Sequence, residues 1–331
     1  MFGCYRFLLA ILVALSHFGI QAAGFNPGQW AVISFYVLSG LLMDRQFHKL
    51  SPHGKEFGGF YLDRWLRVYP LFIVVLLLAW TQTHLSRAGA AGNVALLPLN
   101  YYEFSGIRVL ISPSWSLACE AHFYLLVPLL AVCSTKTLRI VAGASLGLFA
   151  VSPVLPHAAF WAYVGLPGIL FTFVTGILIN RQDAFFRKML GLVMFGLLAG
   201  FAATKLAHTG LPTGIHINVA IGYLVAAVVV PRLDRLPANL KWDKFLGLFA
   251  YPLFLCHGPL AEYIELHWGV SHAFVLLFWS ILLSFMLTFM LILTVEIPFD
   301  LIRYRIRAIS KRRASSRTRE AAATGILPGS L

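Results

Sequence analysis

Arg6 and His17 stand eleven positions apart in the first apolar segment of the chain. An α-helix turns about 100° per residue, so both side chains lie on nearly the same face, about 16 Å apart along the axis. Ionisable residues inside membrane segments are costly and are commonly functional. His17 is therefore a candidate general base, and the competing interpretation is a histidine that only hydrogen-bonds between helices.

Arg64 and Arg67 lie three positions apart in the segment Phe60–Pro70, so they share one face of a helix. Two neighbouring guanidinium groups can hold a phosphate through paired hydrogen bonds. The alternative is that both residues only fix the orientation of the chain and contact lipid headgroups. With Arg6, they are the candidate residues for binding an anionic cofactor.

Glu120 opens an apolar segment that follows Pro113 and Ser114, residues typical of a helix start. We expect it at a depth in the membrane similar to that of His17. A carboxylate there can orient an imidazole or help to remove the proton of an acceptor hydroxyl. A solvated glutamate at a helix entry is the competing interpretation.

The elements that must position these residues are membrane helices. Of the 331 residues, 59% are hydrophobic and 12% are charged, whereas soluble domains average roughly 45–50% apolar and about 25% charged residues. Apolar runs recur about ten times, and a span needs roughly 20 residues. They predict an all-α fold, a polytopic transmembrane bundle of about ten helices. The expected segments are 5–23, 29–43, 69–85, 120–133, 138–152, 160–179, 190–206, 215–230, 245–264 and 273–296, with long loops at 44–68 and 86–119.

Lysine and arginine are distributed unevenly between the loops. Of the 26 such residues, all but Arg87, Arg108 and Lys205 fall in alternate loops, in the C-terminal tail or at Arg6. Because positive residues gather on the cytoplasmic side, both termini are expected in the cytoplasm. The net charge of +13 is thus explained by topology and does not indicate nucleic acid binding. Residues 1–302 are the expected membrane domain, and residues 303–331 a basic tail, disordered beyond Arg313, that contacts membrane lipids.

The histidines and cysteines show no metal-binding pattern. No two histidines have the HxxxH spacing, and the four cysteines lack CxxC spacing. We therefore expect no metal ion.

Six segments together resemble the membrane acyltransferase-3 family. They are Arg6 to His17, Phe35–Gly40 (FYVLSG), Phe60–Pro70 with both arginines, Ser114–Tyr124 (SWSLACEAHFY), Tyr251–His257 (YPLFLCH) and Val295–Phe299 (VEIPF). They occur in the family's order and extend over residues 6–299. The chain departs from the family pattern at Gly3–Tyr5, where Asp-Gly-Leu is frequent, and at Ala121-His122, where Glu-Gln is usual.

The resemblance implies an integral membrane O-acyltransferase. Such an enzyme moves an acyl group, commonly acetyl, from cytoplasmic acyl-CoA to a hydroxyl of an extracytoplasmic or lipid-linked glycan. His17 would be the base or a transient acyl carrier, assisted by Glu120. The residues implied for binding are Arg6, Arg64 and Arg67 for acetyl-CoA, and Trp115, Tyr124 and His257 for the substrate.

A bacterial inner-membrane enzyme that modifies an exopolysaccharide or a lipopolysaccharide is the favoured hypothesis. A transporter or flippase for lipid-linked sugars is the main alternative, although carriers usually have repeat-related halves and no internal repeat is visible in the sequence. A second alternative is an acyltransferase that acts on a small-molecule acceptor.

Overall fold

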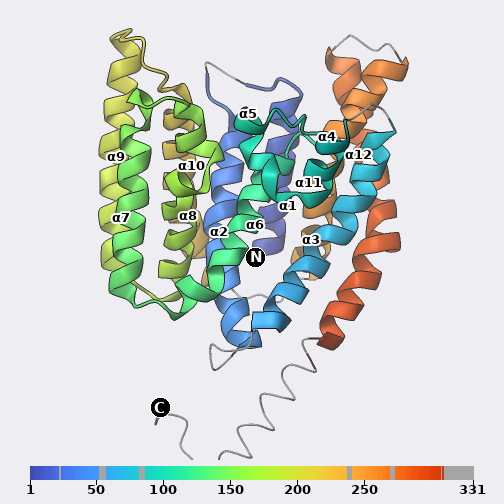
Figure 1. The fold of residues 1–331 in the computed structure, drawn as a ribbon, viewed down its shortest axis with the longest axis horizontal. Helices are drawn as coiled ribbons and strands as arrows, with labels where there is room; N and C mark the ends of the chain where they lie inside the picture. Colours follow the sequence, from blue (N-terminus) through green and yellow to red (C-terminus); the bar gives the residue numbers. More distant parts are fainter. Residues whose placement is uncertain are drawn as a thin grey trace, which may run out of the picture.

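The computed structural model describes residues 1–21, 24–51, 57–81, 86–236, 241–268, 273–306 and 308 (Figure 1). The α-helices are α1 Phe2–His17, α2 Pro27–Leu50, α3 Phe57–Trp80, α4 Arg87–Ala95, α5 Tyr102–Ser105, α6 Ser114–Val132, α7 Thr135–Val151, α8 Leu166–Asn180, α9 Ala184–Leu206, α10 Gly214–Asp234, α11 Lys241–Trp268 and α12 Ala273–Leu291. Two 3₁₀ turns (Leu97–Tyr101 and Ser152–Val154) and two π-helical turns (Phe160–Val164 and Ile292–Glu296) lie between or after them. The described residues contain no strand, which confirms the predicted all-α fold.

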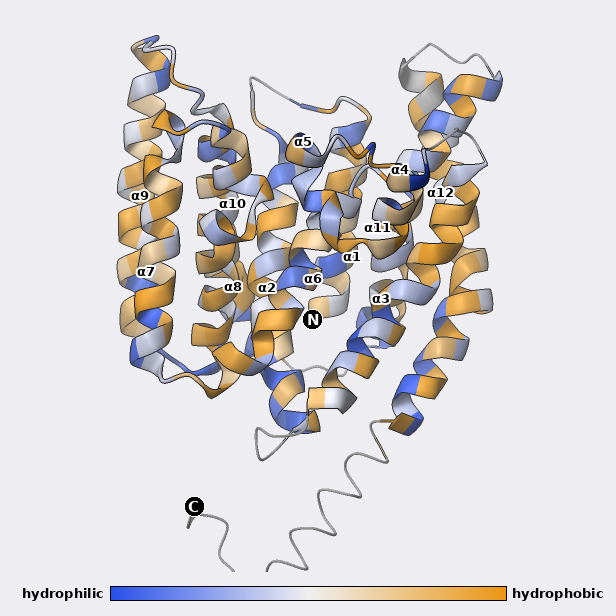
Figure 2. Cartoon of the chain, in the orientation of Figure 1, coloured by the Kyte–Doolittle hydropathy of each residue, from blue (hydrophilic) through white to orange (hydrophobic). Residues whose placement is uncertain are grey.

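The bundle has the composition of a multi-pass membrane protein. Six helical stretches are long and apolar enough to cross a membrane, and they are Ser114–Val132, Thr135–Val154, Phe160–Asn180, Ala184–Leu206, Gly214–Asp234 and Leu277–Ile306. α1 is apolar but shorter, and α2, α3 and α11 run beside these helices with more polar residues (Figures 1 and 2). Large apolar side chains such as Leu192 and Phe195 are exposed on α9. Each of the ten predicted segments overlaps a helix, although segments 5–23 and 69–85 extend beyond the ends of α1 and α3.

The segment predicted as a long polar loop after the second span is largely helical, because α2 and α3 extend into it from both sides. The prediction was wrong because its polar side chains have partners on other helices. Asn180 donates a hydrogen bond to Asp44 over 2.6 Å, and Arg45 forms a bidentate pair with Asp234 at 2.6 and 2.7 Å. Paired polar groups of this kind are tolerated inside a bundle.

Glycines let the central helices approach closely. A Cβ atom on Gly40 of α2 would lie 1.9 Å from the carbonyl oxygen of Phe173 in α8. A Cβ atom on Gly3 of α1 would lie 1.7 Å from the carbonyl oxygen of Asp243 in α11. Small residues at such crossings are a common means of packing membrane helices. The crossings fix α2 against α8 and α1 against α11, and these helices occupy the middle of the bundle in Figure 1.

The two ends of the bundle differ in charge. The connections from α2 to α3, α6 to α7, α8 to α9 and α10 to α11 all lie at one end of the bundle, which we call the basic end. Its lysines and arginines are Arg45, Lys49, Lys136, Arg139, Arg181, Arg187, Lys188, Arg232, Arg235, Lys241 and Lys244. The other end carries α4 and α5 (Figure 1). Of the predicted tail, residues 303–306 continue the last helix, and the stretch expected to be disordered lies outside the described residues.

Candidate active site

A pocket of about 870 Å³, part of it open to the outside, lies among α1, α2, α3, α6 and α11. Its polar lining residues are Arg6, Tyr36, Ser39, Arg64, Arg67, Ser116, Glu120, Tyr124 and Tyr251, and the remaining lining is apolar. Five of the residues predicted from the sequence therefore meet in one pocket, although they come from three helices, α1, α3 and α6. Three of the five are the arginines expected to bind an anionic cofactor.

The pocket is elongated along the bundle. Its lining on α2 runs from Val32 to Met43, a separation of eleven positions or about 16 Å of helix. This is roughly half of the 30 Å hydrocarbon core of a bilayer. Since α2 ends and α3 begins at the basic end, Met43 and Arg64 mark the side of the pocket nearer to that end. Val32 and Ser116, close to the starts of α2 and α6, mark the other side.

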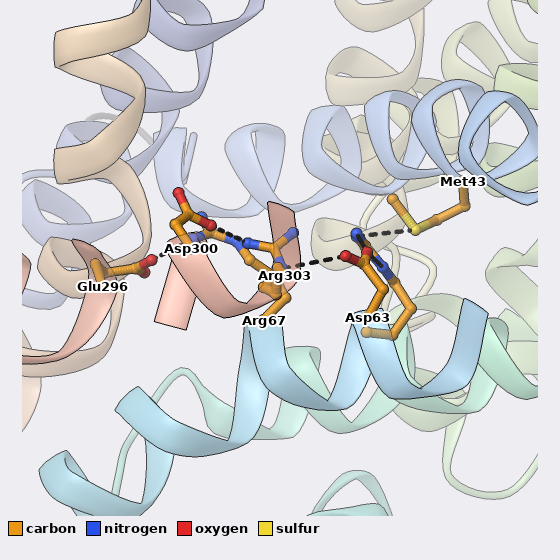
Figure 3. Close-up of polar contacts among 7 residues, drawn as sticks. Met43, Asp63, Arg67, Glu296, Asp300 and Arg303 are labelled. Carbon is orange, nitrogen blue, oxygen red and sulfur yellow. Dashed lines mark hydrogen bonds and ion pairs between the residues drawn. The ribbon is translucent and has the colours of Figure 1, made fainter. Parts of the chain in front are cut away.

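Carboxylates meet the guanidinium groups on the side of the pocket nearer to the basic end. Arg67 Nη1 donates a hydrogen bond to Glu296 Oε2 over 2.5 Å. Arg64 pairs with the adjacent Asp63, which also interacts with Arg303 Nε at 3.4 Å. Figure 3 shows these contacts, which link α3 to the last helix. The arginines predicted as free phosphate ligands are thus partly neutralised by acidic residues.

Arg6 differs from the other two arginines of the pocket. Its Nε donates to the carbonyl oxygen of Phe2 over 3.3 Å, and no ion pair joins it to a carboxylate in the described part of the chain. The pocket lining and the ion-paired groups next to it contain as many carboxylates as guanidinium groups. These are Asp63, Glu120, Glu296 and Asp300 against Arg6, Arg64, Arg67 and Arg303. At Arg64 and Arg67 an anionic ligand must therefore exchange with a carboxylate, whereas Arg6 is available without such an exchange.

Glu120 accepts two hydrogen bonds on the same oxygen. Ser39 Oγ donates to Glu120 Oε1 over 2.5 Å, and the Tyr124 hydroxyl donates to it over 2.7 Å. The second carboxylate oxygen, Oε2, receives no hydrogen bond from the described residues. Because Glu120 is half-buried in the pocket lining, that oxygen is accessible to a bound hydroxyl or amide group.

His17 lies outside the pocket lining and pairs with another histidine. Its Nδ1 is 2.7 Å from Nε2 of His257, and the two rings are close to parallel at 17°. His257 is fully buried, whereas His17 is exposed. The expected contact between Glu120 and His17 does not occur among the described residues. The imidazole is instead oriented by His257, a residue that the sequence assigned to substrate binding.

Trp115 also lies outside the pocket lining, since its ring packs edge-on against Tyr163 with centroids 4.8 Å apart. Sequence analysis missed the roles of Ser39 and Glu296, which hold Glu120 and Arg67. Both lie inside segments that resemble the acyltransferase-3 family, FYVLSG and VEIPF, so the resemblance contained a signal for them.

No group of three or more histidine, cysteine or acidic side chains in the described part of the chain could hold a metal ion. The arrangement offers guanidinium groups for an anion, one carboxylate in the pocket and one exposed imidazole. Such groups can serve acyl transfer by acid–base or nucleophilic catalysis.

Comparison with known proteins agrees with this chemistry. The chain is 22% identical over 203 residues to an uncharacterized protein of Aquifex aeolicus (strain VF5), covering 59% of this chain and 90% of that protein. No solved structure matches the chain. The sequence profile of the acyltransferase-3 family, described as an acyltransferase domain, matches residues 4–295, which is most of the chain. The protein therefore belongs to the acyltransferase-3 family of membrane acyltransferases.

Proposed function

We propose that the protein transfers an acetyl group from acetyl-CoA to a hydroxyl of a glycan, either a lipid-linked or extracytoplasmic sugar of an exopolysaccharide or a lipopolysaccharide. One observation carries the proposal. The pocket extends about 16 Å along α2, with guanidinium groups on the side nearer to the basic end and an apolar stretch beyond them. That shape and charge suit a donor with an anionic head and a long, narrow thioester arm.

The donor phosphates would bind at the arginines. Arg6 offers a guanidinium without a carboxylate partner, and Arg64 and Arg67 offer groups that can exchange a carboxylate for a phosphate. Guanidinium groups hold phosphates in paired, charge-assisted hydrogen bonds. The carboxylate partners compensate the buried charges of Arg64 and Arg67 while no donor is bound, which matters because an unpaired charge inside a membrane protein is costly.

The chemical step would use His17. Arg6 lines the pocket, and His17 lies on the same face of α1 about three turns further from the basic end. His17 either removes the proton of the acceptor hydroxyl or carries the acyl group transiently, and both routes stay open. Glu120 would act through its free oxygen on a group bound in the pocket, because its contacts are with Ser39 and Tyr124.

The orientation proposed for the chain follows from charge. Positive residues gather on the cytoplasmic side of membrane proteins, so the basic end would face the cytoplasm, where acetyl-CoA is made. Both termini would then be cytoplasmic and His17 would lie toward the outer face of a bacterial inner membrane. Donor and acceptor would reach the bundle from opposite sides.

Purified protein in lipid nanodiscs tests the proposal. With a glycan acceptor, the wild-type chain should release free thiol from acetyl-CoA and form an acetylated product. Arg6→Gln should raise the KM for acetyl-CoA by about 10- to 100-fold, because a hydrogen bond to a charged group is worth about 1.5–3 kcal/mol. Lys205→Gln, a cation at the other end of the bundle, is the matched control and should leave the KM unchanged.

Two results would overturn the proposal. A chain that moves lipid-linked sugars between leaflets without consuming acetyl-CoA would be a carrier. A His17→Ala variant with full acetyl-transfer activity would exclude both routes through His17. If the protein acetylates small hydroxylated molecules and not the glycan, the proposed acetyltransferase activity stands and the proposed glycan acceptor is wrong.

A further inference from the structure

His17, the last residue of α1, and His257, in the middle of α11, meet in surroundings that differ. Nδ1 of His17 is 2.7 Å from Nε2 of His257, and Nδ1 of His257 is 2.9 Å from the carbonyl oxygen of Leu253, one turn earlier in α11. The side chain of His257 is fully buried, and that of His17 is exposed. Only His17 can therefore meet a substrate that approaches from outside the bundle.

The contact with Leu253 fixes where the protons lie. A carbonyl oxygen accepts hydrogen bonds and never donates them, so Nδ1 of His257 must carry a proton. No carboxylate in the described residues forms an ion pair with His257, and an uncompensated charge in a fully buried ring is expensive. A neutral imidazole has a single N–H group. Nε2 of His257 is therefore the acceptor, and the hydrogen bond between the rings is donated by His17.

The same reasoning assigns the second nitrogen of His17. Its Nδ1 carries the proton that is donated to His257, so in the neutral ring Nε2 has the free lone pair. We infer that His257 is a positioning residue that holds His17 in the Nδ1–H tautomer and presents Nε2 as the reacting nitrogen. This inference rests on the proposed function of His17 and gives His257 a role other than substrate binding.

Both chemical routes require this tautomer. In the general-base route the acceptor hydroxyl gives its proton to His17 Nε2 while its oxygen bonds the acyl carbon. The carbon–sulfur bond breaks, and the proton passes to the thiolate to give ester and free thiol. In the carrier route Nε2 bonds the acyl carbon as the thiolate leaves, and the acceptor hydroxyl then takes the acyl group while its proton goes to the thiolate. If the proton of His17 were on Nε2, this nitrogen would have no free electron pair for either route.

Two variants of His257 separate positioning from packing. His257→Leu removes the acceptor for His17, whereas His257→Gln keeps an oxygen that can reach a similar place. Loss of the partner that orients a histidine costs 10–100-fold at metal sites and about 10⁴-fold in a serine protease triad. We expect His257→Leu to lower kcat at least about 10-fold with the KM for acetyl-CoA unchanged, and His257→Gln to restore most of kcat.

A matched control is available in α10. His216 is also fully buried, with Nδ1 near the carbonyl oxygen of Pro212 and Nε2 bonded to Ser152. His216→Leu should reduce thermal stability about as much as His257→Leu does, and it should leave kcat unchanged. If both variants lower kcat equally, the effect of His257 is only structural and the inference fails.

The tautomer itself can be measured in the resting protein, independently of activity. In the full chain labelled with ¹⁵N-histidine, the His17 signals, identified by their loss in His17→Gln, should show protonated Nδ1 and unprotonated Nε2. A protonated Nε2 with an unprotonated Nδ1 overturns the inference even if acetyl transfer is confirmed. Because this measurement uses the resting protein, it tests the role of His257 even if His257→Leu fails to fold. As a rescue, Nδ1-methylhistidine at position 17 in the His257→Ala background forces the lone pair onto Nε2. It should regain activity that His257→Ala alone has lost.

Discussion

The ion pair between Arg67 and Glu296 gives a prediction in which folding and donor binding can be separated. The pair joins α3 to the π-helical turn after α12, at 2.5 Å, with the side chains 18% and 5% exposed. Its members lie 229 positions apart in the chain. Arg67 also lies over the ring of Tyr251, 5.3 Å from its centroid. We consider the variants Arg67→Gln, Glu296→Gln and the double variant.

Burial determines the size of the effect. Removing one partner of a buried ion pair costs about 3–5 kcal/mol, because the other charge is left uncompensated, whereas replacing both is close to neutral. At roughly 2–4 °C per kcal/mol, each single variant should lower the Tm by about 6 °C or more. The Glu296→Gln effect should be the smaller one, because Arg67 keeps its contact with the Tyr251 ring. The double variant should recover most of the lost Tm.

The KM for acetyl-CoA gives the second measurement. If Arg67 binds a donor phosphate, both Arg67→Gln and the double variant should have a KM raised about 10-fold or more, although only the former is unstable. Thermal unfolding and initial rates are measured in the same nanodiscs. The exposed pair of Arg108 and Glu262 at 3.1 Å is the control, and its removal should change the Tm little, because surface pairs contribute about 0–1 kcal/mol.

The reasoning is refuted by either of two results. If Arg67→Gln unfolds at the wild-type temperature, the pair does not stabilise the bundle. If the double variant regains both the Tm and the wild-type KM, Arg67 is a structural residue and the donor binds elsewhere.

Three further predictions concern Glu120, the α2–α8 crossing and a loop carboxylate. Glu120→Gln keeps an acceptor for Ser39 and Tyr124 but loses the negative charge. Because the carboxylate is proposed to take part in proton transfer, kcat should fall about 10²-fold or more at unchanged Tm. A variant with wild-type kcat contradicts this role. Gly176→Ala puts a Cβ atom 2.1 Å from the carbonyl oxygen of Val37, so α2 and α8 must separate and the protein loses about 1–3 kcal/mol of stability, which lowers the Tm. The control is Gly143→Ala, whose Cβ atom meets nothing within 4 Å and should leave the Tm unchanged. The hydrogen bond from Arg139 lowers the pKa of Asp183, so this carboxylate stabilises the fold above about pH 4, and the stabilisation is lost as the pH falls through the lowered pKa. Asp183→Asn retains a helix cap and should unfold at a lower temperature than the wild type at pH 7. The difference in Tm should vanish at low pH. A difference in Tm that is independent of pH argues against the ion pair.

Paired carboxylates explain how the pocket and its surroundings can hold several arginines inside a membrane protein. Four guanidinium groups without counter-charges would repel one another and would be poorly solvated inside a bundle. The carboxylates of Asp63, Glu296 and Asp300 compensate Arg64, Arg67 and Arg303 in the structure. If the donor binds at these arginines as proposed, its phosphates would take over contacts that the carboxylates make in the free protein.

The sequence by itself determined the membrane bundle and five of the charged and polar residues that line the pocket. Apolar runs report directly on burial in lipid, so each of the ten predicted segments overlaps a helix. Local spacing placed Arg64 and Arg67 on one face of α3. The positions of Arg6 and Glu120 in apolar segments singled them out, the family resemblance added Tyr124, and all five meet in the pocket. The ends of α2 and α3 were missed, because the partners that allow polar residues inside a helix are far away in the chain.

Only the tertiary structure decided which charged and polar groups are paired. His17 and His257 are 240 positions apart, and Arg67 and Glu296 are 229 positions apart. Helical periodicity shows which face of a helix is polar, but it carries no information on which other helix will cover that face. That choice depends on the close crossings at glycines such as Gly3 and Gly40, where backbone contact fixes the neighbouring helix and its rotation. The contact of Glu120 with Ser39 in place of His17 follows from those crossings and could not be read from spacing.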